Sequence, residues 1–102
     1  MELVVATYKL SSKFPEEEKF GLSSQMRRAA VSIPSNIAEG AARNSTKEYI
    51  RFLYIALGSL SELETQFLIS NRLEYLNDLL EDAITEIRKM LLSLIKSLKK
   101  KI

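Results

Sequence analysis

Hydrophobic residues recur along most of the chain at steps of three and four, which is the spacing of one face of an α-helix. The steps are most regular in two stretches. One stretch places apolar residues at Tyr49, Leu53, Ala56, Leu60, Leu63 and Phe67, and the other repeats the pattern at Leu80, Ile84, Ile87, Leu91, Leu94 and Leu98. Such seams are typical of helices that pack along one another in a bundle. The pattern therefore predicts an all-α protein.

Boundary signals divide the chain into four helices. Pro15 is followed by three glutamates, a favourable helix start, because proline is tolerated in the first turn and acids suit the positive end of the helix dipole. Ser45 and Glu48 have capping-box spacing, which predicts a helix that begins at Thr46. We expect helices over about residues 2–13, 16–43, 46–70 and 78–100. For the second helix, the alternative is that Gly21 interrupts it and shifts its ordered start towards Ser23. With short links they predict a single domain, residues 1–102, folded as an antiparallel up-down-up-down four-helix bundle.

The third predicted helix is apolar over more of its circumference than one packed face requires. Its hydrophobic residues outside the seam include Ile50, Phe52, Tyr54, Ile55, Leu57, Leu68 and Ile69. We expect a helix of this kind to be buried centrally or to contact another subunit.

The stretch RRAAVSIPSNIAEG, residues 27–40, places a proline inside a strong helical pattern. The apolar residues on both sides of Pro34 fall within an arc of roughly 120°, with no slip in phase across it. We therefore expect one helix that is kinked at Pro34; the alternative is a break there, with Ser35 capping a new helix. Asn36 and Glu39 are interpreted as satisfying backbone groups at the kink, and Gly40 as allowing a helix or subunit to approach closely. The alternative is that Asn36 and Glu39 bind a ligand.

Composition excludes several classes of enzyme. The 102 residues contain no cysteine and no histidine. Thiolate metal sites, zinc hydrolase sites and histidine-dependent triads or nucleases are therefore ruled out. The spacing of the acidic residues requires no carboxylate metal cluster. We expect no enzymatic activity, no cofactor and no small-molecule substrate.

Membrane and export signals are missing from the pattern. The longest uncharged run, from Phe52 to Ser61, is half of the roughly 20 residues that a membrane-spanning helix needs. The first residues, MELVVATYKL, lack the basic-then-apolar order of a signal peptide. We expect a cytoplasmic protein with no membrane insertion.

The formal net charge of +2 is too small to indicate nucleic-acid binding by itself. Its distribution singles out basic residues around the second and third helices and in the tail KSLKKKI. Permanently charged guanidinium groups suit phosphate, so the candidate nucleic-acid-binding residues are Arg27, Arg28, Arg43, Lys47, Arg51, Lys99 and Lys100. The alternative is that the arginines are solvated or paired with Glu39, Glu62 or Glu64. For the tail, the candidate partners are RNA and an anionic membrane surface, and the alternative is a solubilising basic helix end. The tail has no aromatic residue between its lysines, so alone it would bind weakly and in a salt-sensitive way.

Several motifs together resemble a known family. The most specific are Gly21-Leu22, Gln25 with Arg27-Arg28-Ala29, Ser32-Ile33-Pro34, Asn36-Ile37-Ala38-Glu39-Gly40, Leu57-Gly58-Ser59 and Glu62-Leu63-Glu64. Nearly the whole chain resembles the four-helix-bundle family named after proteins encoded in 23S rRNA intervening sequences. Members usually begin with an additional aromatic-rich stretch, which this sequence lacks. We therefore expect its first helix to be short and to leave apolar surface uncovered.

The resemblance implies a ring-like homopentamer. It also implies kinship with the accessory proteins of diversity-generating retroelements, which bind RNA and a reverse transcriptase through a basic surface. The resulting hypothesis is a non-enzymatic oligomeric module that binds structured RNA, or a nucleoprotein partner such as a reverse-transcriptase-like protein. The alternative is a structural or protein-interaction scaffold with no nucleic-acid role.

Overall fold

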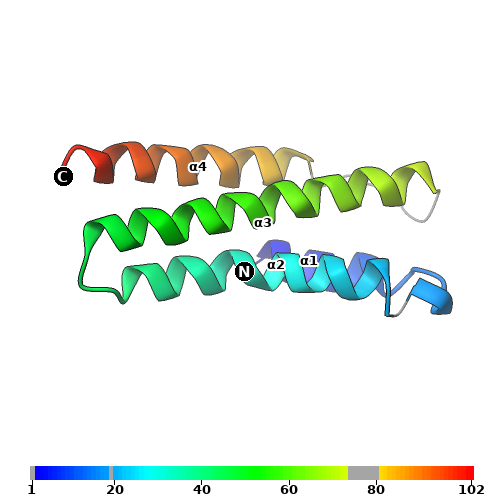
Figure 1. The fold of residues 1–102 in the computed structure, drawn as a ribbon. Helices are drawn as coiled ribbons and strands as arrows, with labels where there is room; N and C mark the ends of the chain where they lie inside the picture. Colours follow the sequence, from blue (N-terminus) through cyan, green and yellow to red (C-terminus); the bar gives the residue numbers. More distant parts are fainter. Residues whose placement is uncertain (1, 19, 74–80) are drawn as a thin grey trace.

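The computed structural model describes residues 2–18, 20–73 and 81–102 (Figure 1). Within these ranges the chain forms four α-helices and one 3-10 turn, and no strand: α1 (Glu2–Ser11), η1 (Glu16–Glu18), α2 (Leu22–Ala41), α3 (Thr46–Arg72) and α4 (Glu81–Lys99). The all-α prediction is confirmed. The molecule is elongated, measuring 47 × 23 × 18 Å.

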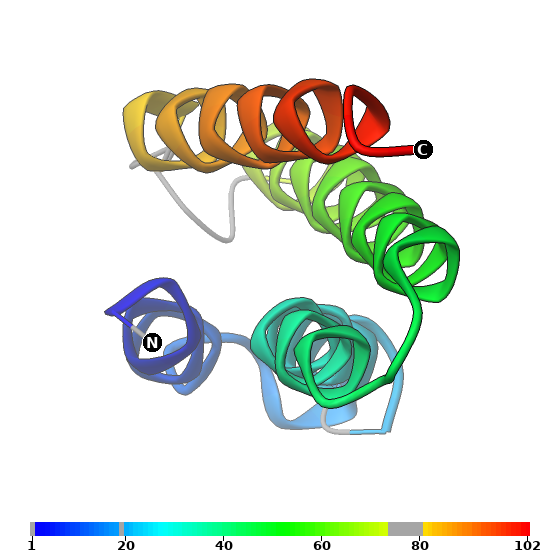
Figure 2. The ribbon, with the colours of Figure 1, turned by 90° about the vertical axis from the view of Figure 1, so that its left-hand side faces the viewer.

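Helices that follow one another in the sequence pack on one another. In Figure 1, α2 runs from right to left, α3 runs back and α4 returns to the left-hand end. The most extensive contact is between α2 and α3, while α1 packs on α2 and α4 packs on α3. Among the described residues, α1 and α4 make no comparable contact with each other. Seen end-on, the four helices therefore follow an open arc rather than a closed square (Figure 2).

The core lies along the α2–α3 pair and extends to α1 and α4. Its largest fully buried apolar side chains are Met26, Leu53, Leu60, Leu63, Phe67 and Ile84. The seam of α3 is buried from Leu53 to Phe67, with Tyr49 partly buried at its start. In α4, Ile84, Leu91 and Ile95 are buried, while Leu80 lies outside the described residues. Each seam faces a neighbouring helix. Packing removes its apolar side chains from water, and this burial stabilises the fold.

Contacts on two sides explain only part of the apolar surface of α3. The helix lies between α2 and α4, as central burial requires. Tyr54, Ile55, Leu68 and Ile69 nevertheless remain 42 to 47% exposed. The second predicted possibility, a contact with another subunit, is not tested by a single chain.

The start of α3 follows the capping prediction. Ser45 is the N-cap, and its side-chain oxygen accepts a hydrogen bond of 3.3 Å from the backbone N–H of Glu48. The helix begins at Thr46 as predicted and continues to Arg72, two residues beyond the predicted end. A serine at this position satisfies one of the backbone donors that the first helical turn leaves unpaired.

Residue 16 is wrong as the start of α2, whereas the alternative of an interruption at Gly21 with a start near Ser23 is confirmed. The predicted helix 16–43 is replaced by the turn η1 and a helix that begins only at Leu22. Gly21 separates the two with φ of −106° and ψ of −110°, a backbone conformation outside the helical region. The glutamates still serve the helix start, because the carboxylate of Glu18 accepts a hydrogen bond of 3.3 Å from the Leu22 N–H.

Smaller differences affect the other ends. The helix α1 ends at Ser11 rather than at residue 13, α2 ends at Ala41 rather than at residue 43, and α4 ends at Lys99 rather than at residue 100. Residues 78–80, where the fourth helix was expected to begin, lie outside the described part of the chain.

The helix α2 continues through Pro34, so the alternative of a break capped by Ser35 is wrong. Asn36 braces this region: its side-chain amide donates to the Ser32 carbonyl oxygen at 2.7 Å and to the Ser32 hydroxyl at 2.9 Å. The kink itself stays a prediction. Proline cannot donate to the carbonyl four residues earlier, so a bend at this position is expected on backbone grounds.

Gly40 lies at a close approach of α2 and α3. A Cβ atom placed on Gly40 would come within 2.6 Å of the Phe52 Cβ and 3.1 Å of Tyr49 Cδ1. Only a residue without a side chain fits between these two helices here.

Candidate nucleic-acid interface

Three helix ends meet at the left-hand end of the molecule in Figure 1: the carboxyl ends of α2 and α4 and the amino end of α3. Basic residues are concentrated in these segments. We define the basic end by seven residues: Arg43, Lys47, Arg51, Lys96, Lys99, Lys100 and Lys101. Segments 39–58 and 91–102, which form this end, contain two acidic residues, Glu39 and Glu48. The other described residues have an excess of acids, seven basic residues against nine, so the charge of the described part of the chain is polarised along the long axis.

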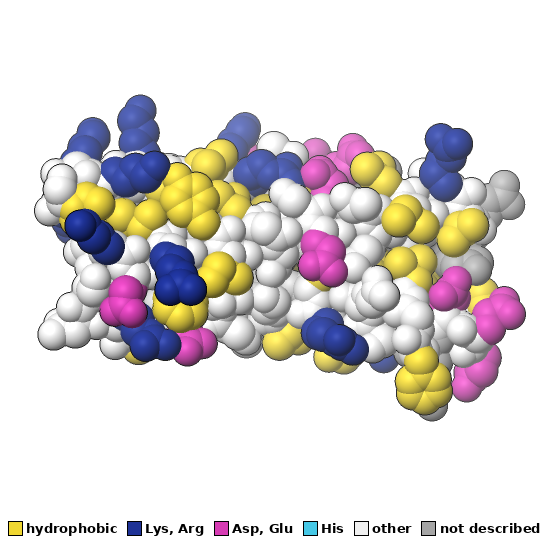
Figure 3. Space-filling view, viewed as in Figure 1, with side chains coloured by type: hydrophobic (Ala, Val, Ile, Leu, Met, Phe, Trp, Pro, Cys, Tyr) yellow, Lys and Arg dark blue, Asp and Glu magenta, His cyan; other side chains and the backbone are white. Residues whose placement is uncertain are grey.

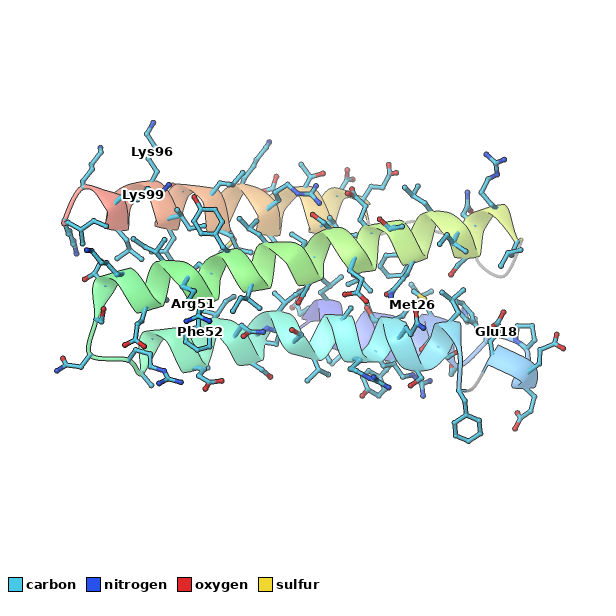
Figure 4. The ribbon with its side chains drawn as sticks, viewed as in Figure 1. Glu18, Met26, Arg51, Phe52, Lys96 and Lys99 are labelled. Carbon is cyan, nitrogen blue, oxygen red and sulfur yellow. The ribbon has the colours of Figure 1, made fainter. Side chains whose placement is uncertain are left out.

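The structure brings five of the seven predicted nucleic-acid-binding residues together at the basic end. They are Arg43, Lys47, Arg51, Lys99 and Lys100. Figure 4 shows Arg51 on α3 and Lys96 and Lys99 on α4 at the same end of the molecule. Lys96 and Lys101, which were not among the predicted residues, belong to the same surface because Lys96 lies in the last turn of α4 and Lys101 follows directly after the helix.

Aromatic side chains lie between the cations of the basic end. The Lys99 ammonium donates a hydrogen bond of 2.8 Å to the Tyr54 hydroxyl and lies 5.3 Å from the centre of its ring. The Arg43 guanidinium lies 5.1 Å from the centre of the Phe52 ring. Tyr54 is 47% exposed, so its ring is accessible to a stacking partner. The tail KSLKKKI itself contains no aromatic residue, but α3 supplies Tyr54 beside Lys99.

Most of these charges are not neutralised within the protein. Arg43 pairs with Glu39 at 3.0 Å, and both side chains are exposed. Lys47, Arg51, Lys96 and Lys100 form no ion pair with any described residue. Of the other acids considered as pairing partners, Glu64 binds Arg88 at 2.9 Å and Glu62 accepts a hydrogen bond from Gln66. The cationic groups of the basic end therefore project an uncompensated positive field into solvent.

Arg27 lies apart from the basic end and joins two helices. Its Nε donates to the Ser11 hydroxyl at 2.8 Å and its Nη2 to the Tyr8 carbonyl oxygen at 3.4 Å. The guanidinium also lies 4.8 Å from the centre of the Tyr8 ring. These contacts hold α1 against α2, so Arg27 is occupied by a structural role.

Arg28 lines an open surface groove. Its contact with Ser24, at 3.4 Å, stays within α2. The groove has a volume of about 660 Å³ and is lined on its apolar side by Tyr8, Phe20 and Val31. The structure therefore separates Arg27 and Arg28 from the other five predicted residues.

The described residues include no group of three or more Asp, Glu, His or Cys side chains placed to hold a metal ion. In the same part of the chain, no helix has both the length and the hydrophobicity needed to cross a membrane.

The comparison with known proteins agrees with this architecture. The family model of the 23S rRNA-intervening sequence protein matches residues 1–96. The chain belongs to this family. A crystal structure of a protein of unknown function from the S23 ribosomal protein family of Bacteroides thetaiotaomicron is 33% identical to it, over 93% of both chains, with a TM-score of 0.81. No functionally curated protein shows significant similarity to the chain.

In this member of the 23S rRNA-intervening sequence protein family, several motif residues connect helices. The hydroxyls of Ser32 and Ser59 form a hydrogen bond of 2.8 Å between α2 and α3. Glu64 joins α3 to α4 through Arg88, and Arg27 joins α2 to α1. The motifs that carry the family resemblance therefore largely describe packing, whereas the lysines of the α4 tail lie outside them.

Proposed function

We propose that this protein is a non-enzymatic homo-oligomeric module that binds structured RNA, or a nucleoprotein partner, through its basic end. The observation that carries the proposal is the convergence of seven cations, against two acids, on one end of the molecule. Phosphate groups are bound by such a surface through charge neutralisation, which supplies affinity without sequence selectivity. Tyr54, exposed beside Lys99, would add stacking to an unpaired base.

The proposal includes the antiparallel up-down-up-down course of the chain, with α2 bent at Pro34. This course puts the carboxyl ends of α2 and α4 beside the amino end of α3. Lys99 would be far from Arg43 and Arg51 in any arrangement in which α4 ran the other way.

Self-assembly is the second part of the proposal. One basic end is a small patch, and its binding would be weak at physiological salt. A homopentamer, as the family resemblance implies, would present five such patches, and patches that engage one RNA together gain affinity through effective concentration. We place this assembly in the cytoplasm, with structured RNA or a reverse-transcriptase-like protein as its partner and with no small-molecule substrate or cofactor.

A second candidate function is a protein-interaction scaffold with no nucleic-acid role. It is favoured by the exposed apolar residues, among them Val5, Met90 and Leu92, which are 48 to 69% exposed. Surface of this kind is suited to contacts with protein rather than with a phosphate backbone.

An RNA mobility-shift assay at low salt separates the two candidates. The triple variant Arg51→Glu, Lys99→Glu, Lys100→Glu should lose the shift of a stem–loop RNA that the wild-type protein produces. The matched control reverses three exposed cations elsewhere, Lys9, Lys13 and Arg72, and changes the net charge equally. It should bind within about threefold of wild type, because a local surface rather than the net charge is responsible.

Circular dichroism establishes that both triple variants remain helical. If wild type produces no shift at low salt, RNA binding is refuted and the scaffold function is favoured. If the two triple variants lose affinity equally, the basic end is not the binding surface.

A further inference from the structure

A polar pocket lies between α2 and α3, near the middle of both helices. It has a volume of about 430 Å³, and its lining is formed by Gln25, Arg28, Ala29, Ser32, Ser59 and Glu62. We call it the α2–α3 pocket. In Figure 3, hydrophobic side chains gather over the left and right parts of the visible face, and the surface between them is mostly polar. A cavity of this volume is within the range of sites that bind small molecules.

The lining of the α2–α3 pocket differs from an ordinary contact between helices. Its one apolar lining residue is Ala29, although helices normally pack by burying apolar side chains. All six lining residues belong to the motifs that carry the family resemblance. None of them belongs to the basic end, so the proposed RNA binding does not account for them.

Opposite charges line the α2–α3 pocket without meeting. Arg28 and Glu62 form no ion pair with each other or with any other described residue. Arg28 donates a hydrogen bond of 3.4 Å to Ser24, and most of its N–H groups have no partner in the described part of the chain. The pocket therefore offers one place for an anionic group and another for a cationic group.

Two serines add a hydrogen-bond donor to the pocket. The hydroxyls of Ser32 and Ser59 are 2.8 Å apart and share one hydrogen. The amide of Asn36 donates to the Ser32 oxygen at 2.9 Å, which fixes the position of that oxygen. Each hydroxyl carries one hydrogen, so whichever serine donates to the other, the second hydrogen stays available to an acceptor in the pocket.

The carboxylate of Glu62 is held by a buried side chain. Gln66 follows Glu62 by one helical turn and is 5% exposed, and its Nε2 donates to a carboxylate oxygen of Glu62 at 3.2 Å. A carboxylate only accepts hydrogen bonds, so the Nε2 side of the amide must face Glu62. This orientation leaves Gln66 Oε1 buried without a hydrogen-bond partner among the described residues. An unpaired buried oxygen destabilises a fold, so packing alone does not explain Gln66, whereas holding Glu62 in place for a ligand does.

We infer that the α2–α3 pocket binds a small zwitterion of the α-amino acid class. The carboxylate of the ligand contacts Arg28 and the available serine hydroxyl, and its ammonium group contacts Glu62. A simple anion would be repelled by Glu62 and a simple cation by Arg28, so a ligand with both charges fits best. The ligand is bound and released unchanged. The inference goes beyond the proposed RNA binding and does not rest on it.

Other ligand classes fit this lining less well. Proteins hold an unpaired nucleobase by stacking it on aromatic rings, and no described aromatic residue lines the pocket. A calcium or magnesium ion needs several oxygen ligands. Glu62 is the one carboxylate among the described lining residues, and Arg28 lies in the same cavity.

Nuclear magnetic resonance titration of the ¹⁵N-labelled protein tests the site. The free proteinogenic amino acids are added one at a time, up to about 10 mM. We expect at least one of them to shift the amide signals of residues 25–32 and 59–62 in a saturable way. If none shifts these signals, or if the shifts lie elsewhere in the chain, the inference is overturned.

Derivatives of the amino acid that binds test the requirement for both charges. Its N-acetyl derivative lacks the ammonium charge, and its methyl ester lacks the carboxylate charge. Each should bind at least about tenfold more weakly than the free amino acid, because one charged contact is lost. Equal binding by the N-acetyl derivative, or by inorganic phosphate, would make the pocket an anion site at Arg28 and overturn the zwitterion.

Variants of the two charged residues test their roles. Glu62→Gln and Arg28→Gln should each weaken binding at least about tenfold. The matched controls are Glu48→Gln and Arg72→Gln, which remove the same charges at exposed positions outside the pocket. The controls should bind within about twofold of wild type, since screened charges at this distance act weakly. Equal losses in the controls would overturn the assignment of Glu62 and Arg28.

Gln66→Met separates the positioning role of Gln66 from a role in the fold. The variant removes the hydrogen bond to Glu62 together with the unpaired Oε1. We expect amino acid binding to weaken at least about threefold while the melting temperature stays the same or rises, because a buried unpaired oxygen is lost. A lower melting temperature with unchanged affinity would assign Gln66 to the fold alone. Glu62→Gln should shift RNA as wild type does, so failure of RNA binding and failure of this inference are measured independently.

Discussion

Individual residues in this protein owe their roles to neighbours that are distant in the sequence. The close approach permitted by Gly40 was predicted, because a glycine inside a strong helical pattern suggests close contact. The structural role of Arg27 was not predicted from the sequence. Its partners, Tyr8 and Ser11, lie 19 and 16 residues earlier, and nothing in the spacing shows that they come within reach. An arginine beside an apolar stripe therefore suggested a phosphate contact when its guanidinium in fact joins two helices.

Gly40 provides the prediction at this scale. Gly40→Ala should destabilise the protein by about 1 to 3 kcal/mol, although alanine favours helices by up to about 1 kcal/mol over glycine. The overlap at 2.6 Å is with the Cβ of Phe52, an atom fixed to the backbone, so a change of rotamer cannot relieve it. Urea denaturation followed by circular dichroism measures the difference. A variant as stable as wild type would show that α2 and α3 can separate at no cost.

Helices were predictable where local chemistry determines their ends. Ser45 caps α3 as its spacing with Glu48 indicates, since both residues belong to the same turn. The start of α2 depends on a competition between two plausible starts. Pro15 and its glutamates favour residue 16, but Gly21 interrupts the helix, and the capping hydrogen bond to Leu22 comes from Glu18. The local sequence identifies both possible starts of α2, but it does not show which of the two is more stable.

At the level of elements, α1 is held mainly by α2, because among the described residues it makes no comparable contact with α4. Arg27→Met removes two hydrogen bonds to α1 and the contact with the Tyr8 ring while keeping an aliphatic side chain. We expect amide hydrogen exchange in residues 3–11 to accelerate about tenfold or more, since a hydrogen bond from a charged group is worth about 1.5 to 3 kcal/mol. Exchange in α3 should stay unchanged.

Arg28→Met is the matched control for this experiment. Among the described residues Arg28 bonds only to Ser24 within α2, so its replacement should leave exchange in residues 3–11 at the wild-type rate. Equal acceleration in both variants would mean that general loss of charge, rather than the Arg27 contacts, loosens α1.

At the level of the whole molecule, the basic end follows from the order of the helices. The two clusters that form it, residues 43–51 and 96–101, are separated by most of α3 and α4 and look unrelated in the sequence. A bundle with alternating helix directions places them at one end, so this part of the site was within reach of sequence reasoning once the topology was proposed. The contact between Tyr54 and Lys99 could not be predicted from the sequence, because it depends on how α4 is rotated about its axis against α3.

The last prediction concerns the dependence of RNA binding on salt. If phosphates contact the basic end, the logarithm of the binding constant should fall linearly with the logarithm of salt concentration. Its slope should be about −0.7 to −0.9 for each phosphate neutralised. Replacing Lys99 and Lys100 by Gln should therefore make the slope shallower by about 1.4 to 1.8 for each protomer that engages RNA. Fluorescence anisotropy with a labelled stem–loop RNA, titrated at several salt concentrations, measures both slopes.

The control variant carries Lys9→Gln and Lys13→Gln, on the opposite part of the molecule, and should leave the slope unchanged. A loss of affinity in the Lys99 and Lys100 variant at constant slope would instead indicate that these lysines act on the fold or on the assembly, and not on phosphate.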